Sequence, residues 1–394
     1  MLKVVWLAPY NINDLKPEVV VTREIVYHSA SWIYNLAEYL SLEKEIDFHI
    51  ITYSNLVNKS QTFRKNNITF HIIRYCFPFT QRGFPWYLPL DKLTVYYSFS
   101  RQAKKIINEI SPDILHVHGT EAGYYLPTVN SHTPCIISIQ GIITEYIKFE
   151  PYISGYLQIL YEKFAVRKAK YFGCRTNFDS GFVKKYNKKS VIFDLPEAMN
   201  TVFFEQEWKP QPGLSLLFVG SIIKRKGIED LIKALAKLKP TFPNIILKII
   251  GSGAKGYINQ LNSIIEELQI QSNVDWIGNK TPNEIAEELS KATLFVLPTL
   301  IDNSPNCLAE AMAVGIPCIA TKVGGIPSMI EDTHDGMLFK KNDRNELVNR
   351  IKLLSIDTAL QYKLSQNARS KAFERNYPTK VVKKYIEVYK SLIK

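Results

Sequence analysis

Two carboxylates, Asp302 and Glu310, stand eight positions apart in the segment PTLIDNSPNCLAEAMAVG, which begins at Pro298. An apolar strand pattern precedes the segment and a helical pattern begins at Cys307, so the first acid lies on a loop and the second in the first turns of a helix. A carboxylate at Glu310 can accept hydrogen bonds from two neighbouring ribose hydroxyls, and Asp302 can face the same ligand. Taken singly, Glu310 could be a solvated helix glutamate and Asp302 a loop cap.

The start of the same helix could hold an anion. The first backbone N–H groups of a helix have no partner within it, so those of Asn306, Cys307 and Leu308 can point at a diphosphate. Asn306 could equally be a plain N-cap.

A second, basic loop lies in VGSIIKRKGIEDLIKAL, which begins at Val219. The strand pattern ends at Gly220, Ser221 follows, and Lys226 stands just before a helical pattern. Arg225 and Lys226 can neutralise phosphate groups. A lone basic loop residue is usually only part of the surface, but two such loops after strands of one sheet favour a shared phosphate site.

The elements that would position these loops alternate between short apolar strands and longer helices, which predicts two α/β domains with doubly wound parallel sheets facing a central cleft. We expect an N-terminal acceptor-binding domain over 1–195, a C-terminal nucleotide-binding domain over 196–375, and a helix over 376–394 that crosses back to the N-terminal domain. The strands predicted for the two halves are 4–8, 48–53, 69–75, 114–117, 135–140, 171–174, 214–219, 245–250, 274–277, 294–297, 318–321 and 337–339.

Composition excludes several classes. The chain has 394 residues, 46% of them hydrophobic and 22% charged, which is ordinary for a globular protein and atypical of a disordered or collagen-like one. The apolar runs fall well short of the roughly 20 residues that a membrane-spanning helix needs, and the N-terminus does not resemble a signal peptide. The five cysteines are scattered without a CxxC pair, which argues against a disulfide framework or zinc site. We therefore expect a cytoplasmic protein.

The formal net charge is +12, and it is uneven. Nine basic residues and one acid lie between Lys163 and Lys189, and the last segment, from Asn376, has five lysines and one glutamate. Such stretches could contact an anionic membrane surface from the cytoplasmic side or simply be solvated. The chain has no zinc spacing, RNP-like motif or recognition helix, so we expect no nucleic-acid partner.

At this point a resemblance to a known family is clear. The pair Asp302 and Glu310, followed by EAMAVGIPCIAT and Gly324-Gly325, resembles the two-acid motif of glycosyltransferase family 4, a retaining, nucleotide-sugar-dependent family with the GT-B fold. Asp302 stands where glutamate is usual, in a DNxPN form of the motif. The resemblance covers nearly the whole chain. It implies catalytic roles for His118, Lys226, Asp302 and Glu310.

The same resemblance assigns further donor contacts. It implies that the donor nucleotide is bound by Gly220, Ser221, Arg225, Lys226, Gly251, Ile277, Asn306, Cys307, Leu308 and Glu310. His118 ends the segment DILHVHGT, which resembles the family's strand-end histidine and would contact the donor sugar; the alternative is a structural histidine. By alternation, His116 shares its strand face.

Three features depart from the usual family pattern or belong to a subset of it. The family usually has arginine directly after Gly220, where this chain has Ser221. The loop after the first strand lacks glycine and leads into HSASWIYNLA, which begins at His28. The segment CRTNFDS also resembles a subset motif, and its Arg175 and Asp179 could line the cleft or form an ion pair at a helix start.

The resemblance implies transfer of a sugar from a nucleotide diphosphate sugar, with a UDP-sugar expected, to a hydroxyl of a sugar or lipid-linked saccharide during surface polysaccharide or glycolipid assembly. No cofactor beyond the donor is expected, and no metal, because no DxD-type carboxylate pair is present. A nucleotide-sugar epimerase of the same fold and a non-catalytic nucleotide-sugar-binding protein remain alternatives. A dehydrogenase is disfavoured, since no GxGxxG follows the first strand.

Overall fold

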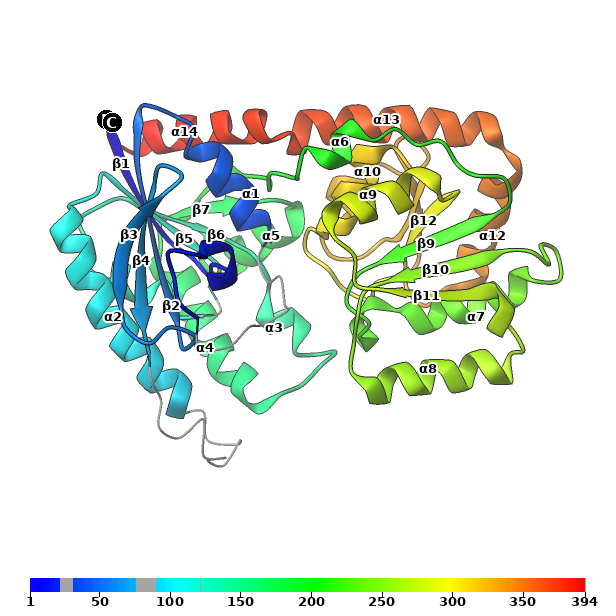
Figure 1. Cartoon of the computed structure of the whole chain (residues 1–394), viewed down its shortest axis with the longest axis horizontal. Coiled ribbons are helices and arrows are strands. Elements are labelled where there is room, and N and C mark those ends of the chain that lie inside the picture. The colour runs from blue at the N-terminus through cyan, green and yellow to red at the C-terminus, as the bar shows by residue number, and fades with distance from the viewer. Residues whose placement is uncertain (22–30, 76–89, 121, 394) are drawn as a thin grey trace. The chain divides into compact units, whose positions relative to one another are not determined.

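The computed structural model describes residues 1–21, 31–75, 90–120 and 122–393. The chain divides into two compact units: Met1–Ala198 together with Pro378–Lys394, and Met199–Tyr377 (Figure 1). We call them the N-terminal and C-terminal units. Each contains a parallel sheet with helices on both faces, so the prediction of two doubly wound α/β domains is confirmed.

The N-terminal unit is built on a sheet of order β3-β4-β2-β1-β5-β6-β7-β8, parallel except for the β3–β4 pair. Sequence analysis missed β3 and β8. Both are edge strands, and few of their side chains are buried, so neither carries the continuous apolar run of a central strand. The strands are β1 Leu2–Leu7, β2 Ile46–Ser54, β3 Gln61–Lys65, β4 Ile68–Arg74, β5 Ile114–His118, β6 Cys135–Ser138, β7 Tyr171–Cys174 and β8 Val191–Asp194.

Side chains alternate along β1, so its residues enter two separate cores. Val4 and Trp6 pack on one face with α1 (Ser31–Leu40) and the C-terminal helix α14 (Pro378–Ile393). Val5 and Leu7 pack on the other face, which is covered by α2 (Leu90–Ile110), α4 (Ile153–Lys168) and α5 (Asn177–Tyr186). The short segments of this unit are η1 Ile12–Leu15, η3 Leu126–Thr128 and α3 Ile143–Tyr146.

The C-terminal unit is built on a fully parallel sheet of order β11-β10-β9-β12-β13-β14. Its strands are β9 Ser215–Val219, β10 Ile246–Ile250, β11 Val274–Gly278, β12 Leu294–Leu297, β13 Cys318–Thr321 and β14 Met337–Phe339. Its helices are α6 Val202–Glu205, η4 Lys224–Lys226, α7 Ile228–Leu238, α8 Lys255–Glu267, η5 Gln271–Asn273, α9 Pro282–Lys291, α10 Asn306–Val314, α11 Ile326–Met329, α12 Arg344–Ile356 and α13 Thr358–Asn376. None of the helices within the described ranges is long and apolar enough to span a bilayer.

The strand order locates the crevice at which such sheets bind ligands. In the C-terminal unit, β9 has β10 on one side and β12 on the other, so the chain reverses its direction of travel across the sheet between β9 and β12. The loops that leave the carboxyl ends of these two strands diverge and leave room for a ligand. They are the basic loop and the acidic loop of the sequence analysis. In the N-terminal unit the corresponding switch lies between β1 and β5, whose last residue is His118.

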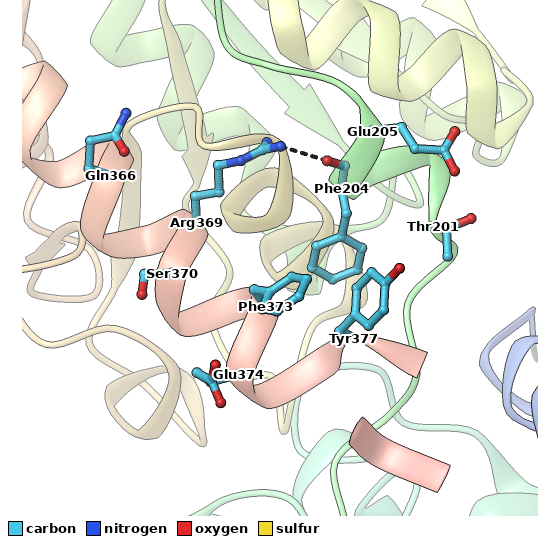
Figure 2. Close-up of a pocket in the computed structure, with 9 residues that line it drawn as sticks. All are labelled: Thr201, Phe204, Glu205, Gln366, Arg369, Ser370, Phe373, Glu374 and Tyr377. Carbon is cyan, nitrogen blue, oxygen red and sulfur yellow. Dashed lines mark hydrogen bonds between the residues drawn. The ribbon is translucent and has the colours of Figure 1, made fainter. Parts of the chain in front are cut away.

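A pocket of about 440 Å³ lies elsewhere on the C-terminal unit, between α6 and α13. Figure 2 shows Arg369 reaching from α13 toward the carbonyl oxygen of Phe204, to which it donates at 2.6 Å. Its guanidinium also donates to the carbonyls of Ala313 and Val314 at 2.9 and 3.2 Å. Because those carbonyls end α10, Arg369 caps the carboxyl end of the helix whose first turn belongs to the candidate site. The pocket is therefore at the opposite end of α10 from that site.

Candidate functional site in the C-terminal unit

Close backbone contacts fix the loop after β9. Gly220 (φ 154°) and Gly251 (φ 137°) lie so near each other that a Cβ on Gly251 would be 1.9 Å from the Gly220 carbonyl oxygen. The Ile222 N–H donates to the Ser252 carbonyl at 2.8 Å. Only glycine fits at Gly251, because any side chain would push the two loops apart. Ser221, in the position where the family usually has arginine, is exposed and carries no charge.

The basic loop is locked to the acidic loop through its backbone. Gly227 follows η4 in the left-handed conformation (φ 70°), and a Cβ there would be 2.0 Å from the Pro298 carbonyl oxygen. The Arg225 carbonyl accepts from the Leu300 N–H at 2.8 Å and from the buried Thr299 hydroxyl at 3.1 Å. The two loops therefore form one framework, which positions the basic side chains.

Three charged groups meet at this framework. The Lys226 Nζ lies 2.6 Å from Asp302 Oδ2, and an Arg225 guanidinium nitrogen lies 3.7 Å from the same oxygen. The same guanidinium donates to the Ile301 carbonyl at 3.0 Å. All three charged side chains are between 11% and 14% exposed, so their charges act in a poorly solvated environment. The two basic side chains, held beside a carboxylate, can contact an anionic ligand.

The backbone of Asp302 packs against the Gly324-Gly325 turn. The Asp302 carbonyl accepts from the Gly325 N–H at 3.0 Å, and a Cβ on Gly324 would be 1.9 Å from that carbonyl oxygen. Gly324 also has φ +55°, in the left-handed region. The Gly324-Gly325 turn thus lets the loop after β13 pack against the backbone of Asp302 and hold this residue in place.

We expect Gly324→Ala to lower the free energy of unfolding by about 2–4 kcal/mol, since it combines left-handed strain with overpacking against the Asp302 backbone. Gly256→Ala is the matched control, because a Cβ at Gly256 meets nothing within 4 Å on α8. The control should leave stability equal or slightly higher. Urea unfolding of both variants checks this. Equal stability of Gly324→Ala and the native chain would contradict the tight contact.

The start of α10 differs in one respect from the prediction. Pro305 rather than Asn306 occupies the N-cap, without a side-chain cap. The Leu308 N–H donates to the Pro305 carbonyl at 3.1 Å, so the prediction of a free amide at Leu308 is wrong: the first turn tightens and uses that donor. Among the described residues, no acceptor in the chain is found for the Asn306 and Cys307 amides. These two remain available to an anion.

Glu310 lies one turn further into α10 and is half-buried. Burial raises the pKa of the Cys307 thiol; the charge of Lys226 lowers it and those of Glu310 and Asp302 raise it, so these three charges lie near the thiol. Burial is the largest cause, and it raises this pKa to about 12. The Cys307 thiol is therefore protonated at neutral pH and is not a nucleophile.

The predicted base-binding segment lies on the other side of the crevice. Ile277 is half-buried in β11, the edge strand of the sheet, and the adjacent Gly278 carbonyl accepts from the Gly251 N–H at 2.9 Å. The structure thus brings Gly220, Gly251 and Ile277 to neighbouring strand ends. Their contact with a nucleotide stays a prediction.

One cluster among the described residues could offer three metal ligands: Glu331, His334 and Asp335. Asp335 already pairs with Lys371 at 2.6 Å and accepts from the Glu331 N–H at 2.8 Å. These contacts show that Asp335 stabilises the turn before β14. The cluster does not include Asp302 or Glu310.

Candidate functional site in the N-terminal unit

His118 ends β5 and is buried, with 2% of its surface exposed. Within the described ranges, neither ring nitrogen has a hydrogen-bond partner. The ring packs 4.3 Å from that of Trp6 and stacks 4.2 Å from that of His116, so the predicted shared strand face is confirmed. Burial, with the nearby Arg175 charge, lowers the pKa of His118 to about 3. At neutral pH it is an uncharged imidazole with two unused polar atoms, which is unusual for a purely structural histidine.

The ring of His116, which stacks on that of His118, is itself held by hydrogen bonds. The Trp6 indole N–H donates to the Tyr389 hydroxyl at 2.9 Å, and that hydroxyl lies 2.6 Å from His116 Nδ1. The His116 Nε2 lies 2.8 Å from Ser138 Oγ, so both ring nitrogens have a partner. These hydrogen bonds fix the orientation of the His116 ring.

The pKa of His118 predicts a loss of stability in acid. The folded value of about 3 lies below the ordinary 6.5, so the unfolded chain binds more protons between these values. The contribution is complete above pH 6.5 and declines as pH falls toward 3, by about 2 kcal/mol at pH 5. Thermal midpoints from pH 7.5 to 5 should therefore fall more steeply in the native chain than in His118→Gln. Parallel curves would contradict a buried neutral imidazole.

Arg175 and Asp179 are joined through the backbone, because the Arg175 N–H donates to Asp179 Oδ2 at 2.9 Å. The side chain of Arg175 binds the carboxylate of Glu197 and the carbonyl of Gln140. Asp179 forms the capping box of α5 with Thr176. Asp179 thus accepts from backbone amides at the start of α5, and the Arg175 side chain binds Glu197.

Sequence reasoning missed Glu197, Thr299 and Tyr389. Glu197 gave a weak signal, as a single acid within an apolar stretch after β8. His28, named in the sequence analysis, lies outside the described residues.

Comparisons with known proteins bear on both units. Residues 200–371 match the family Glycosyl transferases group 1, and residues 25–176 match the family Glycosyl transferase 4-like. Both families are glycosyltransferases, and both matched segments contain predicted site residues. The chain is a GT-B glycosyltransferase.

The relatives of this glycosyltransferase are distant. It is 25% identical over 332 residues to an uncharacterized glycosyltransferase of Methanocaldococcus jannaschii, covering 83% of this chain and 85% of the relative. Sucrose-phosphate synthase from Thermosynechococcus elongatus superposes with a TM-score of 0.79 at 16% identity, covering 100% of this chain and 99% of the other. HepE of Anabaena, solved in complex with UDP, superposes with a TM-score of 0.73 at 14% identity, covering 99% and 100%. At these identities the two structures establish the fold.

Proposed function

We propose that this glycosyltransferase transfers a sugar, with retention of configuration, from a UDP-sugar to a hydroxyl of a sugar or lipid-linked saccharide. The observation that carries the proposal is the Lys226–Asp302 pair at 2.6 Å, at the switch point between β9 and β12. A basic and an acidic side chain held there suit a ligand with a diphosphate and neighbouring hydroxyls. The UDP bound in the HepE structure supports the choice of base.

In this mechanism the main task is to stabilise the departing diphosphate. Lys226 and Arg225 supply two positive charges, and the Asn306 and Cys307 amides add two hydrogen-bond donors. Once the donor is bound, these groups already face the diphosphate, so little reorganisation is needed as negative charge develops. Lys226 would leave Asp302 for the diphosphate, which frees Asp302 to bind sugar hydroxyls or steady the positive charge that develops on the sugar.

Two further residues have the roles that the family resemblance implies. Glu310 would accept from the ribose hydroxyls, and His118 would offer a neutral imidazole to a sugar hydroxyl. The protonated Cys307 thiol is not available as a covalent nucleophile. By the family resemblance, the leaving phosphate would itself assist the incoming hydroxyl.

The first experiment is a thermal-shift screen of the purified chain against UDP, GDP, ADP and NAD at equal concentrations. We expect a selective rise with UDP. A selective rise in the thermal midpoint with another nucleoside diphosphate would mean that the donor has that base instead of uracil. No response to any of the four compounds would overturn the proposal. Incubation with the matching sugar nucleotide and candidate acceptors then separates the alternatives. A binding protein gives no turnover, an epimerase changes the donor without an acceptor, and a transferase needs the acceptor.

Metal independence is a separate prediction. Because Lys226, Arg225 and the α10 amides supply the charge that a bound cation supplies elsewhere, we expect excess EDTA to leave the transfer rate within twofold of the untreated rate. A large loss that added Mg²⁺ or Mn²⁺ restores would contradict it.

A further inference from the structure

Helix α4 in the N-terminal unit presents large apolar side chains to solvent. Tyr156, Leu160 and Phe164 follow one another at four-residue intervals, so they lie along one face of the helix. They are 61%, 65% and 37% exposed, and Tyr152, at the N-cap of the helix, is 43% exposed. A continuous row of this kind is uncommon on a protein surface that faces only water.

The opposite face of α4 shows that this orientation is fixed. Ala165 and Val166 are buried in the core, and the buried Glu162 accepts from the backbone amides of Ile143 and Thr144 at 2.8 and 2.9 Å. Rotating the helix to bury Leu160 would expose these residues and break the bonds to Glu162. The polar residue faces inward and the large apolar ones face outward.

Basic side chains lie at the carboxyl end of this apolar row. Lys163 and Arg167 of α4 and Lys185 of α5 all lie 5.6 Å from the centre of the Tyr186 ring, which shows that the two helices bring their charges together. The same stretch of chain has further exposed lysines: Lys168, Lys170, Lys184, Lys188 and Lys189. The one acid between Lys163 and Lys189 is Asp179, which is fully buried in its capping box, so the exposed charge of this stretch is entirely positive.

We infer that the exposed face of α4, with the basic end of α5, docks this protein on an anionic lipid surface. We call this surface the α4 face: Tyr152, Tyr156, Leu160, Phe164, Lys163, Arg167, Lys168 and Lys185. Tyrosine, leucine and phenylalanine enter the boundary between headgroups and acyl chains, while the basic side chains pair with acidic headgroups. Charge complementarity favours anionic lipid over a neutral bilayer. The inference does not depend on the nucleotide site, which lies in the other unit.

The test is flotation of the full chain with vesicles of phosphatidylcholine alone or with 40% phosphatidylglycerol. We expect the native chain to float with the anionic vesicles and not with the neutral ones. Tyr156→Ser with Leu160→Ser should weaken the partition constant at least tenfold. Arg167→Gln with Lys168→Gln should weaken it about fivefold for each charge removed.

Matched controls on the C-terminal unit test whether vesicle binding is specific to the α4 face. Ile356→Ser with Tyr362→Ser removes side chains of similar exposure, 73% and 59%, and Lys340→Gln with Lys341→Gln removes two exposed charges. Both controls should bind vesicles like the native chain. Thermal midpoints of all variants, and their response to UDP, should match those of the native chain.

Three results would overturn the inference. The native chain could fail to float with anionic vesicles, the α4 variants could bind as well as the native chain, or the controls could lose as much. Light scattering of the same variants tests the remaining alternative. If the native chain is a dimer that the α4 variants dissociate, and vesicles do not bind, the face belongs to a second copy.

Discussion

Lys226→Ala should lower the rate of sugar transfer by about 10²–10³-fold at saturating donor, because it removes one preorganised charge from the departing diphosphate. The side chain is only 12% exposed, so water cannot readily replace it. The measurement is kcat with the donor that the nucleotide screen identifies. Most of the loss should fall on kcat rather than KM, since the negative charge of the leaving group grows in the transition state.

Lys224→Ala is the matched control for this substitution. Lys224 belongs to the same 3-10 turn but is exposed, so its removal should change the rate less than threefold. A thermal midpoint for each variant is needed, because Lys226→Ala also deprives the buried Asp302 carboxylate of its partner at 2.6 Å. A folded Lys226→Ala chain with the native rate would remove Lys226 from the site.

Glu310→Ala should weaken binding of UDP about 10–100-fold, which corresponds to one or two hydrogen bonds to a charged acceptor. The structural reason is its place on α10, where its charge acts on the Cys307 thiol together with those of Lys226 and Asp302. Calorimetry with UDP and 2′-deoxy-UDP tests the ribose role directly. The native chain should prefer UDP by tenfold or more, and the variant should bind the two about equally.

Glu267→Ala serves as the control for charge alone, since Glu267 is an exposed acid on α8 of the same unit. It should keep both the affinity and the preference for UDP. If Glu310→Ala binds UDP more weakly but still prefers it over the deoxy compound, Glu310 acts through the diphosphate end and not through the ribose.

The fold was largely predictable because buried parallel strands have a clear signature. The predicted bounds of β7, β12, β13 and β14 match those observed, since each is a short apolar run between turns. The edge strands β3 and β8 lack that signature. Their pairing depends on partners elsewhere in the chain, which local patterns do not encode.

The site was predictable as two loops but not as a set of contacts. Strand order implied that the loops after β9 and β12 meet, yet the ion pair between Lys226 and Asp302 joins residues 76 positions apart. The hydrogen bond from the Leu308 N–H to the Pro305 carbonyl depends on how tightly the first turn of α10 is wound. The partner of His116 is Tyr389, 273 positions later, and no spacing rule reaches that far.

The assignment of α14 to the N-terminal unit bears on the order in which the protein folds during synthesis. Tyr385 and Tyr389 complete the core on one face of the first sheet, and they are synthesised after the whole C-terminal unit. The C-terminal unit, Met199–Tyr377, is complete before they appear. The unit whose synthesis begins first is thus expected to finish folding second, once the segment from Pro378 has been made. Until then, the face of the first sheet around Trp6 stays exposed to solvent and to chaperones.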